Sequence, residues 1–307
     1  MPENRMRVKN KPLVTVTFNT WNCEFLLEII NSKRAVGEIE AEIKARLFNY
    51  EQAFSRFLNY SELGRLNQGQ TVEPSPLFIK VLQQAEALVA TIKSDYFNPH
   101  VDLAAQGYDT TFDDLGLKKI KYSVTANIKA PEFPSGVHHQ DNGLKLSPNV
   151  KLDFGSFLKG LVSAQIADIY APDCDGLVVN FGGDLSVRGK DLEADTFAIG
   201  IYNPVLKKDH VVLLKNQSLC TSGSYKRTWT KGTELKHHIT NPVLGTSSNS
   251  DYVSITFWGL DGAMCDALAT AAFNAKPEVW KQWQQALPGV HYLAVHKSGE
   301  IITSTTF

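Results

Sequence analysis

The chain has 307 residues, which is enough for one large domain or two small ones. Hydrophobic residues make up 43% and charged residues 21% of it, so the composition is that of a globular protein and excludes a disordered chain. The formal net charge of −1 shows no basic excess that would indicate nucleic-acid binding, and no apolar run approaches the roughly 18 residues of a membrane-spanning helix. We therefore expect no nucleic-acid partner and no membrane segment.

The N-terminus and the cysteines indicate the compartment. Residues 1–12 are polar and basic and lack the apolar centre of a signal peptide. None of the cysteines forms a CxxC pair, which argues against a zinc cluster and a dense disulfide framework. The four thiols are therefore expected to be free and buried: Cys23, Cys174, Cys220 and Cys265. Together these features predict a cytoplasmic protein.

The N-terminal half is predicted to contain a strand pair and two helices. Apolar and polar residues alternate at the start of Leu13–Ile30, which indicates paired strands. Apolar residues recur at near-helical spacing from Val36 to Phe57 and predict a long amphipathic helix. A second helix begins at Ser75 as the cap, with Pro76 in its first turn, and continues to residue 92. Residues 96–147 are expected to be rich in loops.

The C-terminal half is predicted to be mainly strands with three helices. A short strand at Lys151–Phe154 should pass through Gly155 into a helix near residues 159–170. Further strands are expected at 176–181, 185–188, 196–202, 211–215, 235–239 and 252–258. Helices at 262–273 and 278–287 and a closing hairpin of 291–296 with 301–307 complete the chain. This order indicates an α+β fold with a largely antiparallel sheet and packed helices.

The standard signatures of several enzyme classes are absent. The sequence has no GxGxxG, GxSxG or HExxH motif. Residues 155–160 begin like a phosphate-binding loop, but Leu161 stands where that loop requires lysine.

Two glycine-containing turns could accept an anionic ligand. In residues 153–160, DFGSFLKG, the chain should enter a helix whose first backbone N–H groups are free to bind an anion, although an ordinary strand-to-helix turn would look the same. In residues 179–184, VNFGGD, a buried strand ends in two glycines that allow positive φ and close approach of a ligand, or simply make a turn.

Two polar groups could supply a metal site and a base. Asp266 and Thr270 are four residues apart, so on a helix they share a face and could offer oxygen ligands to Mg²⁺, or else form a solvated or capping pair. His237 and His238 lie at a strand end, where neighbours point to opposite sides, so at most one of them should face a given site and either could be structural.

Taken together and in order, six segments resemble the FAD:protein FMN transferase family, the ApbE-type flavin transferases. FSRFLNYSELGRLN at residues 54–67 resembles the family's FSRY…SELSRLN, and YFNPHV at 96–101, with Gly107 after it, resembles FDPTV…G. Residues 153–160 resemble DLGGIAKG, and 180–184 resemble NIGGD. TSGSYKR at 221–227 with HITNPVLG at 238–245 resembles TSGDYER…HIIDPRTG, and 266–270 match DALAT.

The resemblance implies a fold, a reaction and a substrate. It implies a T-fold-like α+β protein with a cleft for FAD, in which residues 1–307 form a single catalytic unit that could consist of two intertwined subdomains around the cleft. The implied reaction is a Mg²⁺-dependent transfer of FMN from FAD to a Ser or Thr hydroxyl of a target protein, with release of AMP. Phosphoryl transfer needs positioning, a metal and a base, which agrees with the groups noted above.

Carried over position by position, the resemblance assigns site residues. His238 would be the general base. The Mg²⁺ ligands would be the Leu158 carbonyl, Asp266 and the Thr270 hydroxyl. Phe57 would pack on the flavin ring, for which an aromatic face is sufficient. The other residues expected to line or lie near the FAD cleft are Phe97, Asn98, Asp153, Gly155, Lys159, Gly182, Gly183, Asp184, Thr221 and Ser222.

The sequence departs from the family pattern at four positions. Asn98 and Asn241 stand where the family has Asp, Ser156 replaces the second Gly, and Leu158 replaces a small Ala. The two Asn residues motivate an alternative in which the protein binds FAD without catalysis. A second alternative is a pyrophosphatase that splits FAD into FMN and AMP with water as the acceptor.

Overall fold

The computed structural model describes residues 12–103, 131–225, 228–231 and 234–305. Gly107, Lys226 and Arg227 of the family-like segments lie outside the described residues, as does the end of the predicted strand 301–307.

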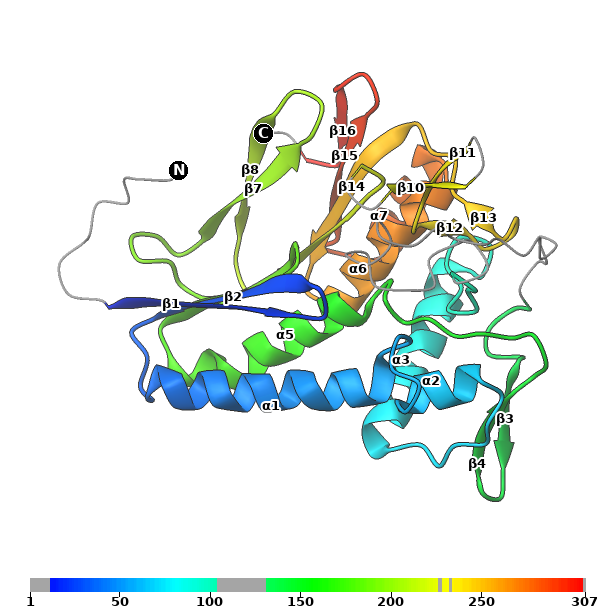
Figure 1. Cartoon of the computed structure of the whole chain (residues 1–307). Coiled ribbons are helices and arrows are strands. Elements are labelled where there is room, and N and C mark those ends of the chain that lie inside the picture. Colours follow the sequence, from blue (N-terminus) through cyan, green and yellow to red (C-terminus); the bar gives the residue numbers. More distant parts are fainter. Residues whose placement is uncertain (1–11, 104–130, 226–227, 232–233, 306–307) are drawn as a thin grey trace.

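An antiparallel sheet of eight strands forms the centre of the molecule (Figure 1). Its strand order is β1-β2-β5-β6-β9-β14-β15-β16, and every neighbouring pair is antiparallel. The strands are β1 (Leu13–Thr20), β2 (Cys23–Ile30), β5 (Gly176–Phe181), β6 (Asp184–Gly189), β9 (Ser218–Gly223), β14 (Tyr252–Gly259), β15 (His291–His296) and β16 (Ile301–Thr303). The predicted α+β class with a largely antiparallel sheet is confirmed.

Helices cover one face of this sheet. Helices α5 (Leu158–Tyr170) and α6 (Gly262–Ala271) pack on each other and on the central strands, and α1 (Val36–Phe54) runs along the far side of α5 (Figure 1). Within the described residues the other helices are α2 (Glu62–Asn67), α3 (Pro76–Ile92), α7 (Pro277–Ala286) and two 3₁₀ turns at Ala171–Asp173 and Ala272–Asn274.

The opposite face of the sheet is covered by a hairpin of β7 (Phe197–Asn203) and β8 (Lys208–Leu214). Alternation along the strands produces the two cores: Leu177 and Val179 of β5 pack with the helices, whereas Val178 between them packs with the hairpin. The smaller strand pairs are β3 (Val137–Gln140) with β4 (Gly143–Leu146), β10 (Thr228–Lys231) with β11 (Glu234–His237), and β12 (Thr240–Asn241) with β13 (Thr246–Ser247).

The prediction of a strand at Lys151–Phe154 was wrong. The Asn67 side chain bonds to the backbone there, where a neighbouring strand would otherwise do so. Asn67 at the end of α2 accepts a hydrogen bond from the Leu152 N–H at 2.8 Å and donates one to the Leu152 carbonyl at 2.9 Å. This segment therefore belongs to no sheet. It runs directly into the turn before α5.

The prediction of loops over residues 96–147 missed β3 and β4. Asp141 and Asn142 form the two-residue turn between these strands, and the Asn142-Gly143 pair at the start of β4 was the available hairpin signal. Leu144 of β4 also exchanges backbone hydrogen bonds with Val72, which ties the hairpin to the segment before α3. Residues 104–130 lie outside the described residues.

Strand β9 was also missed, since its polar sequence does not resemble a buried strand. Three of its hydroxyls reach partners on neighbouring elements: Ser218 with Ser186 at 2.8 Å, Thr221 with Thr256 at 2.9 Å, and Ser222 with Thr270 at 3.0 Å. Polar groups that are hydrogen-bonded in this way can be buried without the usual cost.

Several boundaries differ from the predictions. The first helix ends at Phe54 and not at Phe57, because Ser55 is extended with φ −70° and ψ 115°. The chain then makes the short helix α2, which had not been predicted. The strand predicted at 235–239 ends at His237, and its earlier partner β10 was missed. The remaining predicted helices and strands are present within a few residues of their expected ends.

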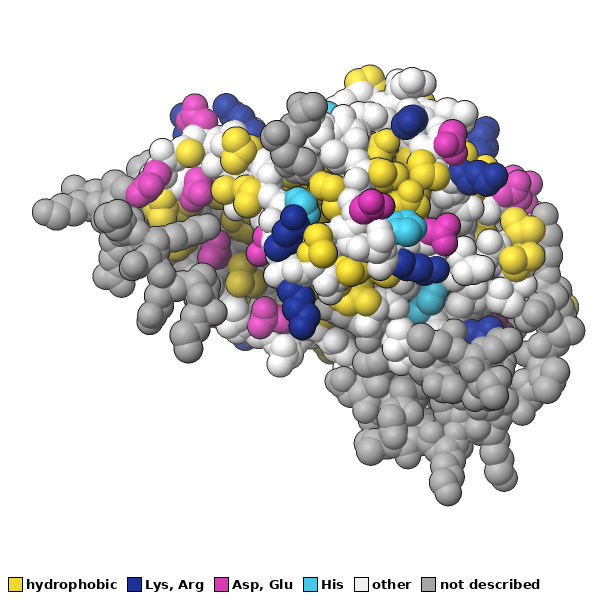
Figure 2. Space-filling view, turned by 90° about the horizontal axis from the view of Figure 1, so that it is seen from above, with side chains coloured by type: hydrophobic (Ala, Val, Ile, Leu, Met, Phe, Trp, Pro, Cys, Tyr) yellow, Lys and Arg dark blue, Asp and Glu magenta, His cyan; other side chains and the backbone are white. Residues whose placement is uncertain are grey.

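The surface is mixed in character, and the predicted burial of the cysteines is confirmed for only two of them. Both signs of charge alternate with hydrophobic side chains on the face shown in Figure 2. All four thiols are free, but only Cys220 and Cys265 are buried, and Cys23 and Cys174 are half-buried. Within the described residues, none of the helices is long and apolar enough to cross a membrane.

Candidate active site

A cavity of about 650 Å³ opens where the helical layer meets the ends of the central strands. It is lined by the β1–β2 turn, the loop after α1, the segment before α5, the β5–β6 turn, β9 and one face of α6. Its volume lies within the range of about 300–1,000 Å³ that is usual for small-molecule sites.

The cavity brings together nearly all of the predicted site residues. Its lining includes His238, Phe57, Phe97, Asn98, Asp153, Gly155, Leu158, Lys159, Gly182, Gly183, Thr221, Ser222, Asp266 and Thr270. Asp184 is the exception: it is 1% exposed and lies beneath Lys159, to which it is ion-paired, instead of at the cavity wall. It also accepts a hydrogen bond from the Thr221 N–H at 3.2 Å.

Three charged groups form a buried cluster at the base of the cavity. Two carboxyl groups, Asp184 and Asp266, face one ammonium group, Lys159, so the cluster carries one unit of excess negative charge when both carboxyl groups are ionised. Burial and the Asp184 carboxylate raise the pKa of Asp266 to about 7, although Lys159 and the Gly160 N–H act against this. Burial lowers the pKa of Lys159, but the two carboxylates outweigh it and the net direction is upward. An added cation would therefore be attracted to this cluster.

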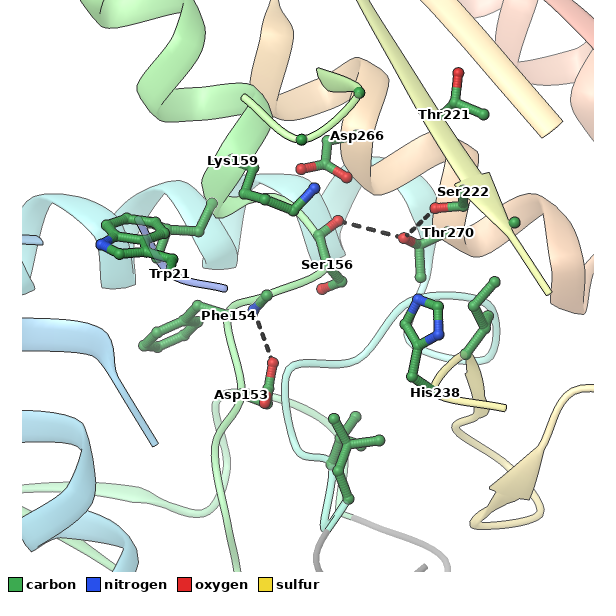
Figure 3. Close-up of a pocket in the computed structure, with 18 of the residues that line it drawn as sticks. Trp21, Asp153, Phe154, Ser156, Lys159, Thr221, Ser222, His238, Asp266 and Thr270 are labelled. Atoms are coloured by element: carbon green, nitrogen blue, oxygen red, sulfur yellow. Dashed lines mark hydrogen bonds between the residues drawn. The ribbon is translucent and has the colours of Figure 1, made fainter. Parts of the chain in front are cut away.

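Oxygen atoms from three elements converge beside this cluster (Figure 3). Thr270 Oγ1 on α6 lies 3.0 Å from Ser222 Oγ on β9 and 3.5 Å from the carbonyl oxygen of Ser156. Asp266 lies one helical turn before Thr270 and shares its face, as predicted from their spacing. The Ser156 carbonyl and the Ser222 hydroxyl were not predicted as part of this oxygen set.

This donor set fits Mg²⁺. Within the described ranges, no group of three or more His, Cys, Asp or Glu residues is placed to hold a metal. Mg²⁺ does not need such a cage, because it usually binds one or two carboxylates together with substrate phosphates. One carboxylate, neutral oxygens and the excess negative charge of the cluster meet that requirement.

Two glycines allow the helices that carry the cluster to touch. A Cβ on Gly160 of α5 would lie 2.3 Å from the Gly262 carbonyl oxygen and 2.6 Å from Asp266 Cβ. Since this space is free, the Gly160 N–H donates to Asp266 Oδ2 at 3.0 Å. The position of Asp266 is therefore fixed directly by the first turn of α5.

The glycine pair between β5 and β6 has the conformation that its sequence suggested. Gly182 and Gly183 have φ of +64° and +103°, which side chains rarely adopt. Asn180 Oδ1 accepts from the Gly183 N–H at 2.9 Å and closes the turn. The bare backbone of this turn forms part of the cavity wall.

Aromatic side chains line the opposite end of the cavity from His238 (Figure 3). Trp21 and Asn22 form the turn between β1 and β2, with φ of +49° and +55°, and the Trp21 ring packs against Phe181 at 4.9 Å between centroids. Sequence reasoning did not assign these two residues to the site; a large aromatic residue in a two-residue turn was the available signal. Tyr50 and Phe54 of α1 extend this aromatic wall.

The two adjacent histidines have different surroundings. His237 Nε2 contacts the Ser248 carbonyl oxygen at 2.9 Å, and burial lowers the pKa of this residue. His238 lies in the cavity wall with its ring turned toward Thr270 (Figure 3). Only one of the pair lines the cavity, as expected, although β11 ends at His237 and strand alternation does not extend to His238.

The two Asn residues that depart from the family pattern are engaged with the backbone. The Asn98 side chain donates to the Pro131 carbonyl at 2.9 Å and accepts from the His100 N–H at 2.9 Å. A carboxylate could not donate to that carbonyl. Asn241 Oδ1 accepts from the N–H groups of Val243 and Leu244 and holds the turn after β12. Both amides stabilise the loops that form the cavity.

The sequence of the chain matches a known protein family over most of its length. A family model described as the ApbE family matches residues 14–294, which is most of the chain. This chain belongs to the ApbE family. The family predicted from the sequence is thereby confirmed.

Curated relatives of this family are named FAD:protein FMN transferase. Those from Treponema pallidum and Chlamydia trachomatis are 28% and 25% identical to this chain, over 87% and 80% of it and over 80% and 79% of their own lengths. Among solved structures, the ApbE protein from Thermotoga maritima superposes with a TM-score of 0.81 at 21% identity, covering 95% of this chain and 97% of its own. The flavinyl transferase ApbE from Pseudomonas stutzeri gives 0.79 at 17% identity, covering 98% and 96%. These structural likenesses show the same fold.

Proposed function

We propose that this protein is a FAD:protein FMN transferase that moves FMN from FAD to a Ser or Thr hydroxyl of a target protein and releases AMP. The observation that carries the proposal is one cavity that unites the oxygen set around Asp266, the first turn of α5, an aromatic end and His238. The names of the curated relatives support the same reaction. A cytoplasmic location and a single catalytic unit over residues 1–307 stay predictions from the sequence.

In this proposal the two ends of FAD are held by different parts of the cavity. Phe57 and its aromatic neighbours hold the flavin end. The start of α5, with Lys159 and the positive end of the helix, faces the diphosphate. Asp266, Thr270 and the Leu158 carbonyl would hold Mg²⁺, with the Ser156 and Ser222 oxygens beside them. When bound, the ion neutralises negative charge on the diphosphate and orients its oxygens.

The proposed base is His238. Its imidazole takes the proton of the acceptor hydroxyl, and the hydroxyl oxygen forms a bond to the FMN phosphorus. The bond from that phosphorus to the bridging oxygen of the diphosphate breaks, and AMP leaves with the bridging oxygen. Positioning and charge neutralisation supply most of the catalysis in such a displacement.

The test is incubation of the protein with FAD, MgCl₂ and an acceptor protein that carries a flavinylation-type Ser/Thr segment. We expect covalent flavin on the acceptor, seen as a mass increase of one FMN less water, with one AMP released for each flavin attached. AMP release without any acceptor would favour the pyrophosphatase alternative. Tight FAD binding with no AMP would favour the non-catalytic one.

Two variants test the assigned roles in the same assay. His238→Ala should retain FAD binding and lose transfer by a factor of about 10² to 10⁴, which is the usual contribution of a general base. Asp266→Ala should abolish transfer and weaken FAD binding only when Mg²⁺ is present. His139→Ala, an exposed position in β3, is the matched control and should behave as wild type. Full transfer by His238→Ala would remove that residue from its role.

A further inference from the structure

Arg56, which was not predicted as a site residue, lies against the ring of Phe57. Arg56 lies in the loop after α1, and its Nε is 3.0 Å from Asp153 Oδ2. Both side chains are only 14% exposed, so this ion pair is much less hydrated than a surface pair. The guanidinium carbon of Arg56 also lies 4.1 Å from the centroid of the Phe57 ring, within the range of a cation–π contact.

The second oxygen of the same carboxylate holds the turn that leads into α5. Asp153 Oδ1 accepts a hydrogen bond from the Gly155 N–H at 2.7 Å (Figure 3). One carboxylate therefore connects the loop that carries Phe57 with the turn that carries the Ser156 carbonyl. Both oxygens of Asp153 are therefore engaged, one by Arg56 and the other by Gly155.

An arginine in a dinucleotide cavity would ordinarily be taken for a phosphate ligand, because its planar fork suits phosphate oxygens. Here the charge of Arg56 is matched by Asp153, and its guanidinium lies on a ring. The diphosphate position of the proposed function is served by Lys159 and the start of α5. The contacts therefore place Arg56 against the Phe57 ring and the turn before α5.

We propose that Arg56, held by Asp153, is a positioning residue that fixes the Phe57 ring as a platform for the flavin of FAD and does not bind its phosphates. The guanidinium lies over one face of the Phe57 ring, and Phe57 itself lines the cavity. An aromatic side chain on a loop loses rotamer freedom when a ligand packs on it, and prior fixing by Arg56 removes that cost. The inference rests on the proposed function, since it takes FAD as the ligand.

The experiment compares two ligands in the presence of Mg²⁺: FAD, and ADP, which carries the diphosphate without a flavin. Dissociation constants are measured by calorimetry for wild type, Arg56→Gln, Phe57→Leu and the double variant. For Arg56→Gln we expect FAD binding to weaken about tenfold, which corresponds to about 1.4 kcal/mol, with less than a twofold change for ADP. Phe57→Leu should have the same selectivity, and the double variant should be no weaker than Phe57→Leu alone.

Three outcomes would overturn the proposal. Equal weakening of FAD and ADP by Arg56→Gln would make Arg56 a phosphate ligand, and additive effects of Arg56→Gln and Phe57→Leu would make the two residues independent. Unchanged FAD binding in Arg56→Gln would also overturn it.

Controls separate this test from folding and from the proposed function. Arg188→Gln removes an arginine of similar exposure, 11%, that pairs with Asp168 outside the cavity, and it should leave both affinities unchanged. Asp153→Asn should weaken FAD but not ADP, and thermal unfolding of each variant shows whether it folds. Failure of the wild-type protein to bind FAD would contradict the proposed function itself. If the wild-type protein binds FAD but the variants weaken FAD and ADP equally, only the role of Arg56 is contradicted.

Discussion

The Asp266 carboxyl group is buried in surroundings that destabilise its charged form. It is 4% exposed and lies near the Asp184 carboxylate, and Lys159 and the Gly160 N–H offset its charge only in part. Burial and this like charge raise its pKa to about 7. A carboxyl group placed in this way is poorly stabilised in the metal-free protein and well prepared to receive a cation.

We predict that the metal-free protein becomes less stable as the pH rises from about 4 to about 7. The folded-state pKa of Asp266 lies above the unfolded value of about 4, so the folded state binds the extra proton in this window and loses that advantage as the pH rises. Asp266→Asn removes the charge and keeps an oxygen for the Gly160 N–H. At pH 8 with EDTA, this variant should therefore unfold at a higher temperature than wild type.

Chemical unfolding at several pH values, with and without MgCl₂, checks this prediction. At pH 8, MgCl₂ should raise the free energy of unfolding of the wild-type protein and leave that of Asp266→Asn unchanged. A wild-type protein whose metal-free stability is flat between pH 4 and 7 would show that the Asp266 carboxylate is compensated by other groups.

At the scale of elements, the contact of α5 with α6 decides the geometry of the site. The helices approach so closely that Gly160 and Gly262 lie backbone to backbone. This approach brings the Gly160 N–H of α5 to Asp266, and the Ser156 carbonyl before α5 to Thr270. Each helix could be predicted from its own sequence, but their distance depends on two residues that have no side chain.

We predict that Gly160→Ala separates the two helices and impairs both stability and transfer. The new Cβ would meet the Gly262 carbonyl and Asp266 Cβ, and such overpacking typically costs about 1–3 kcal/mol. Urea unfolding should show that loss in the free energy of unfolding, and the transfer assay should show a larger loss of activity. Gly37→Ala in the first turn of α1, where a Cβ would meet no atom within 4 Å, should be neutral or stabilising by up to about 1 kcal/mol. Equal behaviour of the two variants would contradict the role given to the Gly160 contact.

At the scale of the whole molecule, the cavity joins segments from almost the full length of the described chain. Its lining extends from Trp21 in the first hairpin to Thr270 in α6. The helix-side core likewise includes residues from Phe25 to Ala294. A ligand that fills the cavity therefore holds together elements that are remote in sequence.

We predict that FAD and Mg²⁺ raise the melting temperature of the protein cooperatively. A ligand at 100 times its dissociation constant adds about 2.7 kcal/mol to the free energy of unfolding. The ion offsets the repulsion between the diphosphate and the excess negative charge of the Lys159 cluster, so the shift with both ligands should exceed the sum of the separate shifts. Differential scanning fluorimetry with FAD, MgCl₂ or both measures this, and strictly additive shifts would place the two ligands at uncoupled sites.

The sequence alone determined the local structure and the list of chemical groups. Helix caps, alternation and spacing predicted most helices and strands, and Asp266 with Thr270 shares a helix face because the helical repeat requires it. Six short segments in the right order also identified the family that the comparison confirmed. These properties depend on residues that are close together in the chain.

Only the tertiary structure decided which groups meet. It placed Asp184 beneath Lys159, joined the Arg56 guanidinium to Asp153, and replaced a predicted strand with contacts to the Asn67 side chain. Strand β9 is buried in spite of its polar sequence because its hydroxyls find partners on three other elements. Such pairs are separated by many residues, and local periodicity contains no information about partners that only folding brings within hydrogen-bonding distance.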